Sequence, residues 1–142
     1  MIYIRANQIA NAFMLFPFQL GSVKTFTKLV EQLDTATFES GEVHPVYATF
    51  SLGRDAEWAC RLFVLEMKED DEEGIGTFLK IEHASPALLG STVVFEATLQ
   101  SAIGNSVICS FTAKVGDRVV AFGETGQKII KKEKLNAIFG TL

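Results

Sequence analysis

The chain has 142 residues, of which 48% are apolar and 21% charged, and its formal net charge is −4. This length suits one domain, and this composition is typical of a globular rather than a disordered protein. The acidic balance argues against a nucleic-acid partner, because phosphate binding needs a concentrated basic surface.

The N-terminal segment, residues 1–20, is predicted to form an apolar arm ahead of a single domain over residues 21–142. Its apolar part, Ala10–Leu20, is too short to span a bilayer and lacks the small-residue cleavage site of a signal peptide. We expect the arm to pack on the domain or on a second subunit. The alternative is that it includes upstream residues from a misplaced start codon.

A strand, a loop and a long helix are predicted in the first half of the domain. Apolar and polar residues alternate loosely over Val23–Val30, which predicts a strand. Residues 34–44 are rich in Thr, Ser, Gly and Glu, which predicts a loop. A helix is predicted over Ser51–Met67, with Ser51 as its N-cap. The helix is apolar nearly all round, as is typical of a helix wrapped by other structure.

An acidic loop and four strands are predicted in the second half. Residues 68–74 contain five consecutive acidic residues, which indicates a solvated loop. The predicted strands are Gly76–His83, Thr92–Ile103, Ser106–Val115 and Arg118–Lys131, with turns at 104–105 and 116–117. One apolar helix and such a meander predict an α+β fold, with an antiparallel sheet wrapped around one long central helix. Because this unit leaves a sheet edge uncovered, we expect a homodimer.

Neither the cysteines nor the C-terminal lysines form a motif of known chemistry. Cys60 and Cys109 lie in apolar runs without CxxC or Cys/His spacing. We therefore expect both to be reduced and buried in a cytoplasmic protein that has no metal site. The basic run is interpreted as a solvated strand end or, alternatively, as a contact to the phosphates of a nucleotide-bearing substrate. It consists of Lys128, Lys131, Lys132 and Lys134.

Glu57 is a charged residue near the start of the apolar helix, and two interpretations of it stay open. In the first, it lies on a solvated stripe with Arg54, Arg61 and Lys68, and Glu57 precedes Arg61 in the favourable i,i+4 order. In the second, its carboxylate near the helix N-terminus acts as a general base or nucleophile. Periodicity alone favours the first interpretation.

His83 and Thr49 are the other two candidates for chemistry. His83 ends a predicted strand; it is either an ordinary surface residue or a group that transfers protons near neutral pH. Thr49 comes just before the predicted helix, eight residues ahead of Glu57. It either bonds a free backbone N–H at the helix start or holds its hydroxyl against a reacting carbonyl.

The spacing of these three residues resembles the fluoroacetyl-CoA thioesterase-like branch of the hot-dog superfamily. The matching stretches are Val46-Tyr47-Ala48-Thr49 with Ala56-Glu57, Gly76-Thr77 with Ile81-Glu82-His83, and His83-Ala84-Ser85-Pro86 with Gly90. The resemblance covers roughly Val23–Leu135 and implies a hot-dog fold, a homodimer and hydrolysis of acyl-CoA thioesters.

By position, the resemblance implies that Thr49, Glu57 and His83 are catalytic and that Gly76 lies close to the substrate. The last strand of relatives often carries an arginine near the substrate. Here Gln127 stands at that position, or Lys128 if the register slips by one. A neutral amide supplies no charge, and a lysine lacks the planar fork of arginine.

Three hypotheses about function follow. The leading one is an acyl-CoA thioesterase that hydrolyses a small acyl-CoA thioester at a dimer-interface pocket, with Gly76 and Gln127 binding the substrate. CoA is then part of the substrate, and no separate cofactor is expected. The alternative is a non-catalytic protein of the same fold that binds acyl-CoA or another small ligand. A third hypothesis is a structural dimer whose apolar arm docks on another protein.

Overall fold

The computed structural model describes residues 4–5, 15–16 and 18–142. Most of the predicted N-terminal arm lies outside these residues, so its packing and the boundary after residue 20 stay predictions. The strands are β1 (Ile4–Arg5), β2 (Leu15–Phe16), β3 (Val23–Leu29), β4 (Thr35–Phe38), β5 (Gly41–Tyr47), β6 (Glu72–His83), β7 (Thr92–Ile103), β8 (Ser106–Val115) and β9 (Arg118–Lys131). The helices are α1 (Thr49–Met67) and α2 (Lys132–Gly140), with a short 3-10 helix at Gln32–Asp34.

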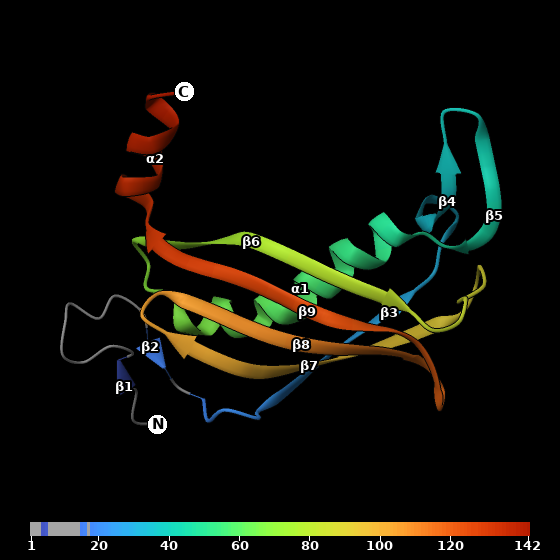
Figure 1. Cartoon of the computed structure of the whole chain (residues 1–142), viewed down its shortest axis with the longest axis horizontal. Helices are drawn as coiled ribbons and strands as arrows, with labels where there is room; N and C mark the ends of the chain where they lie inside the picture. The colour runs from blue at the N-terminus through green and yellow to red at the C-terminus, as the bar shows by residue number, and fades with distance from the viewer. Residues whose placement is uncertain (1–3, 6–14, 17) are drawn as a thin grey trace.

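Five of these strands form one antiparallel sheet in the order β3-β7-β8-β9-β6. The sheet curls around α1, which lies across its concave face (Figure 1). The predicted α+β fold with one central helix is therefore confirmed. Strand β6 forms one edge of this sheet, and its outer side pairs with no other strand of the described chain.

The core lies between α1 and the sheet. The helix contributes Leu52, Ala56, Ala59, Cys60, Phe63, Val64 and Met67, all of them fully buried. Alternate residues of β7 face them, as the period-2 pattern predicted: Val93, Phe95, Ala97 and Leu99. Burying one side chain such as Phe63 stabilises the fold by roughly 2–3 kcal/mol. Both cysteines lie in this core as free thiols, as predicted.

The predicted loop over residues 34–44 is wrong, because most of it belongs to a hairpin formed by β4 and β5. Both faces of this hairpin are largely exposed, so its strands lack the alternation by which strands are detected in a sequence. The hairpin is tied to the helix start at its base. There Thr35 pairs with Tyr47, and the backbone N–H of Ala48 donates to the carbonyl of Asp34 at 2.8 Å.

The predicted acidic loop is also partly wrong. Glu72 is 0% exposed and opens β6, where it pairs with Lys131 of β9. Its Oε1 accepts the backbone N–H of Glu69 at 2.8 Å, whereas Oε2 has no hydrogen-bond partner among the described residues. Burial raises the pKa of Glu72 despite the nearby ammonium of Lys131. This end of the acidic run is buried because it pairs with β9, and composition alone does not reveal that pairing.

The helices differ from the prediction in two places: the start of α1 and the C-terminus. Helix α1 begins at Thr49, Ala48 occupies the N-cap position, and no side-chain cap bond forms, so the predicted Ser51 cap is wrong. Helix α2 was not predicted, and none of its residues is buried. Among the described residues, no helix is long and apolar enough to cross a membrane.

Candidate active site

Thr49 and His83 meet where the start of α1 lies against the end of β6. Thr49 Oγ1 lies 2.9 Å from His83 Nε2, and both side chains are exposed in the single chain. The hydroxyl of Thr49 therefore bonds the imidazole rather than a backbone N–H at the helix start. They line a pocket of about 390 Å³, whose walls also include Ala36, His44, Val46, Tyr47, Ala48, Ala84, Ser85 and Pro86.

Glu57 lies two helical turns further along α1, over Gly76 of β6. Its Oε1 is 2.9 Å from the position that a Cβ atom would occupy at Gly76. Any larger residue at position 76 would meet the carboxylate, since 2.9 Å is closer than ordinary van der Waals contact. Glycine at this position therefore gives the Glu57 carboxylate its place beside the strand.

A second pocket, of about 240 Å³, surrounds this carboxylate. Its lining consists of Arg54, Glu57, Trp58, Arg61, Gly76 and Gln127. The structure thus brings together three of the predicted site residues, Glu57, Gly76 and Gln127. Thr49 and His83 line the other pocket, and eight residues of helix separate Thr49 from Glu57 by about 12 Å. Within a single chain, the five residues therefore line two separate pockets.

The Glu57 carboxylate is free because both neighbouring arginines bond elsewhere. The guanidinium of Arg61 donates to the carbonyl of Gly74 at 2.9 Å and to Glu73 Oε1 at 2.6 Å. Arg54 is held by two aspartates, as described below. The Glu57–Arg61 pair that the solvated-stripe interpretation predicts does not form, and Glu57 makes no hydrogen bond or ion pair within residues 18–142. Its oxygens are available to a ligand.

Gln127 faces this pocket from β9, and Lys128 does not. Successive residues of a strand point to opposite faces. Gln127 is 4% exposed on the helix side of the sheet, and Lys128 is exposed. The Nε2 atom of Gln127 is buried without a hydrogen-bond partner in the described part of the chain. A buried amide without a partner costs stability, and a ligand in the pocket is one way to satisfy it.

A polar network built on the buried Asp34 and Asp55 joins the base of the hairpin to the first turns of α1. Arg54 bonds Asp34 at 2.9 Å and Asp55 at 3.0 Å; the hydroxyl of Tyr47 donates to Asp55, and Lys28 pairs with Asp34 at 3.1 Å. Residues so far apart in sequence carry no local pattern, so sequence reasoning missed this network. It fixes the helix start on which Thr49 stands and keeps Arg54 away from Glu57.

The pKa values of this network follow from its contacts. Burial alone would raise the pKa of Asp34, but the N–H of Glu31 and the cations of Arg54 and Lys28 together lower it. Hydrogen bonds to Asp55 and Asp34 raise the pKa of Arg54. Burial and the neighbouring Asp55 raise the pKa of Tyr47. These shifts favour an ionised Asp34, a protonated Arg54 and a neutral Tyr47 at neutral pH.

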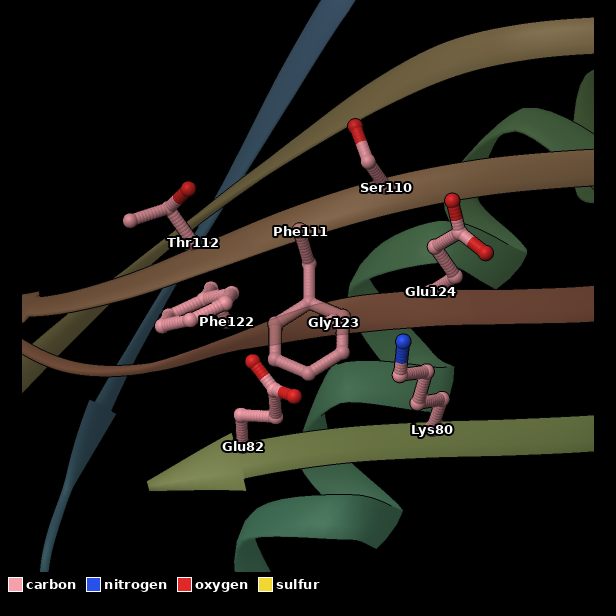
Figure 2. Close-up of a pocket in the computed structure, with 8 residues that line it drawn as sticks. All are labelled: Lys80, Glu82, Ser110, Phe111, Thr112, Phe122, Gly123 and Glu124. Atoms are coloured by element: carbon pink, nitrogen blue, oxygen red, sulfur yellow. The ribbon is translucent and has the colours of Figure 1, made fainter. Parts of the chain in front are cut away.

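A third hollow, of about 350 Å³, lies on the opposite face of the sheet, with α1 behind it (Figure 2). Its side chains rise from β6, β8 and β9, and their charges are mixed. The lining consists of Lys80, Glu82, Ser110, Phe111, Thr112, Phe122, Gly123 and Glu124. It includes none of the predicted site residues, and the sheet separates it from Glu57.

A sheet curled around one helix, with a polar site beside its open edge, defines a hot-dog protein of the thioesterase superfamily. The family is more specific. Residues 30–133 match the family model described as fluoroacetyl-CoA-specific thioesterase, FlK. This match covers more than half of the chain, so the chain belongs to the FlK family of acyl-CoA thioester hydrolases. No protein of curated function matches it.

Solved structures agree with this assignment. A hypothetical protein from Thermus thermophilus, described as a thioesterase superfamily member, is 34% identical over 88% of this chain and 93% of its own, with a TM-score of 0.84. The fluoroacetyl-CoA thioesterase FlK shares the fold at 24% identity over 89% and 98%, with a TM-score of 0.81. A mutant of that enzyme, 26% identical over 83% and 99% with a TM-score of 0.75, was solved with fluoroacetate and CoA.

Proposed function

We propose that this protein is an acyl-CoA thioesterase that hydrolyses small acyl-CoA thioesters at a pocket between two subunits. The observation that carries the proposal is the free Glu57 carboxylate over Gly76, in a member of a thioester hydrolase family. The hydrogen-bonded Thr49–His83 pair adds the hydroxyl and imidazole that thioester cleavage uses.

The division of the five residues between two pockets supports a site shared between subunits. Thr49 and Glu57 are about 12 Å apart along one helix, too far to contact the same carbonyl group. The open edge of β6 can pair with β6 of a second copy. A two-fold axis would then run the two β6 strands antiparallel. This brings the Gly76 region of one chain toward the His83 end of the other, so each complete site takes Glu57 from one copy and Thr49–His83 from its partner.

The proposed chemistry follows from the groups. Glu57 attacks the thioester carbonyl carbon or activates a water that does so, and the C–S bond breaks as the tetrahedral intermediate collapses. If Glu57 is the nucleophile, a water then cleaves the acyl–Glu57 anhydride, which releases the acid and regenerates the carboxylate. Thr49 and the free N–H groups at the start of α1 stabilise the negative charge on the carbonyl oxygen. His83 delivers the proton that the departing thiolate of CoA takes up. Net, water supplies the hydroxyl of the released acid and the hydrogen of the thiol.

Gly76 and Gln127 are proposed to bind the acyl group. Gly76 leaves room beside the carboxylate, and the unpartnered amide of Gln127 offers a hydrogen bond deeper in the pocket. The pocket of about 240 Å³ suits a small acyl group.

The decisive experiment is hydrolysis of a panel of acyl-CoAs by the purified protein and by Glu57→Gln. The matched control is Glu66→Gln, which changes an exposed glutamate of the same helix whose one ion pair among the described residues is with Lys24. We expect hydrolysis of at least one short acyl-CoA, a loss of at least 100-fold in kcat for Glu57→Gln, and normal activity for the control. The proposal fails if no acyl-CoA is hydrolysed or if Glu57→Gln is fully active.

A non-catalytic binding protein of the same fold is the second candidate. The neutral Gln127 favours it, since the family resemblance implies an arginine near the substrate on this strand and a neutral amide supplies no charge. Calorimetry would distinguish the two: saturable binding of acyl-CoA without release of free thiol supports the binding protein and contradicts the enzyme.

A further inference from the structure

Helix α2 leaves the body of the molecule with its apolar side uncovered. None of its residues is buried, and Phe139 is 59% exposed, with Ile138 and Leu142 exposed beside it. Figure 1 shows the helix projecting past the open edge of β6. A helix of nine residues is marginal in water on its own. We therefore expect its apolar side to be stabilised by packing against another surface.

The β4–β5 hairpin presents a second uncovered apolar surface. Phe38 is 60% exposed, and Val43 is exposed on the facing strand. The ring of Phe38 meets that of Phe50, also exposed, with 6.1 Å between their centroids. Three other hairpin residues line the Thr49–His83 pocket: Ala36, His44 and Val46. A body that docks on this hairpin therefore also covers that pocket.

The two surfaces stand at opposite ends of β6, and both extend beyond its open edge (Figure 1). Helix α2 follows Lys131, which pairs with Glu72 at the first end of β6. The hairpin stands near His83, at the other end. An antiparallel β6–β6 pair places the first end of each strand against the last end of the other. Each α2 is thereby brought to the hairpin of the second copy rather than to its own.

The charges on α2 and on the β4–β5 hairpin are complementary. Exposed Lys132 and Lys134 lie in the first turn of α2, with Glu133 as the only acidic residue of the helix. The hairpin carries exposed Glu39 and Glu42, and residues 35–47 contain no lysine or arginine. Opposite charges around an apolar contact favour this pairing over helix on helix or hairpin on hairpin.

We propose that α2 of each chain docks on the β4–β5 hairpin of the second copy and covers its Thr49–His83 pocket. The docking surface is Leu135, Ile138 and Phe139 of the helix with Leu142 just after it, and Phe38, Val43 and Phe50 on the hairpin side. The inference rests on the β6-paired dimer of the proposed function and adds a further element to its site. Docked in this way, α2 holds the hairpin over a bound acyl-CoA and slows its release.

The docking is tested by cross-linking Phe139→Cys to Val43→Cys in co-expressed full-length chains. The native Cys60 and Cys109 are buried, so only the introduced thiols react with a short bis-maleimide. We expect a covalent dimer when the two variants are mixed and none from either variant alone. The matched control replaces Val43→Cys by Glu96→Cys, which lies exposed on β7, and should give no product.

The oligomeric state, measured by sedimentation, distinguishes failure of the α2 docking from failure of the β6-paired dimer. A dimer without cross-link overturns the docking and leaves the β6 pair standing, whereas a monomer overturns both. For function, Ile138→Glu with Phe139→Glu alters two exposed residues, so the fold is retained. We expect KM for acyl-CoA to rise about tenfold with kcat within a factor of three. An unchanged KM overturns the covering role, and the cross-link decides docking even if no acyl-CoA is hydrolysed.

Discussion

The carboxylate of Glu57 fills the space that a side chain at Gly76 would need: Glu57 Oε1 lies 2.9 Å from where a Cβ atom at Gly76 would stand. This arrangement places a glutamate of the central helix beside β6, one of the two edge strands of the five-stranded sheet. The Glu57 carboxylate therefore lies near an edge of the sheet. The first prediction tests this arrangement directly.

Gly76→Ala is expected to lower kcat about 100-fold while the protein stays folded. The added methyl group displaces a flexible carboxylate rather than backbone, so the cost falls on orientation and not on stability. Steady-state kinetics and a thermal melt measure the two effects. Gly140→Ala is the matched control, because nothing lies within 4 Å of its Cβ position. Unchanged kinetics in Gly76→Ala would show that the placement of Glu57 is unimportant.

Glu73→Gln is expected to lower kcat/KM roughly tenfold, although Glu73 lines neither pocket. Without its partner at 2.6 Å, Arg61 is free to pair with Glu57 one turn before it and to reduce its nucleophilicity. Removing the guanidinium in Glu73→Gln/Arg61→Gln should restore activity. Glu124→Gln on the far face of the sheet is the control. Failure of the second substitution to rescue the first would contradict this account.

Thr49→Val is expected to lower kcat by about 100-fold or more, since an isosteric side chain removes only the hydroxyl. Thr49→Ser keeps the hydroxyl and should keep most activity. Unfolding in urea should be nearly unchanged in both variants, because within the described part of the chain this hydroxyl caps no backbone N–H and bonds only His83. A large loss of stability in Thr49→Val would point to a structural role instead.

Asp34→Asn is expected to destabilise the fold by about 2 kcal/mol at pH 7, because it removes a buried charge bonded to Arg54 and Lys28. The pKa of Asp34 is lowered in the fold. Its contribution is therefore complete above the unfolded pKa, near 3.9, and is lost as the pH falls through the lower folded pKa. Urea unfolding at pH 7 and below pH 4 should show the gap between wild type and variant shrink in acid.

The control for this pH dependence is Asp70→Asn, at an exposed position in the turn before β6. It should change stability by less than about 0.5 kcal/mol at either pH. A gap for Asp34→Asn that persists unchanged in acid would show that its cause is packing and not the charge.

Much of the fold was predictable from local pattern. Strands β7, β8 and β9 begin and end where alternation and turn residues predicted, and α1 differs by two residues at its start. The hairpin was missed because its two faces are both exposed, and the buried end of the acidic run was missed because β9 pairs with it. In each case the structure of a stretch depends on the strand it pairs with, β5 for β4 and β9 for β6, and not on a pattern within the stretch.

The sequence by itself determined the α+β fold, the largely apolar central helix with Glu57 near its start, and the residues that resemble a thioesterase site. Only the tertiary structure decided how those residues divide, with Glu57, Gly76 and Gln127 around one pocket and Thr49 with His83 at another. It also decided that Arg61 bonds Glu73 rather than Glu57. Periodicity reports which face of its own element a residue occupies. The partner that a charged group takes depends on strand register and on residues distant in the chain, which only the folded structure brings together.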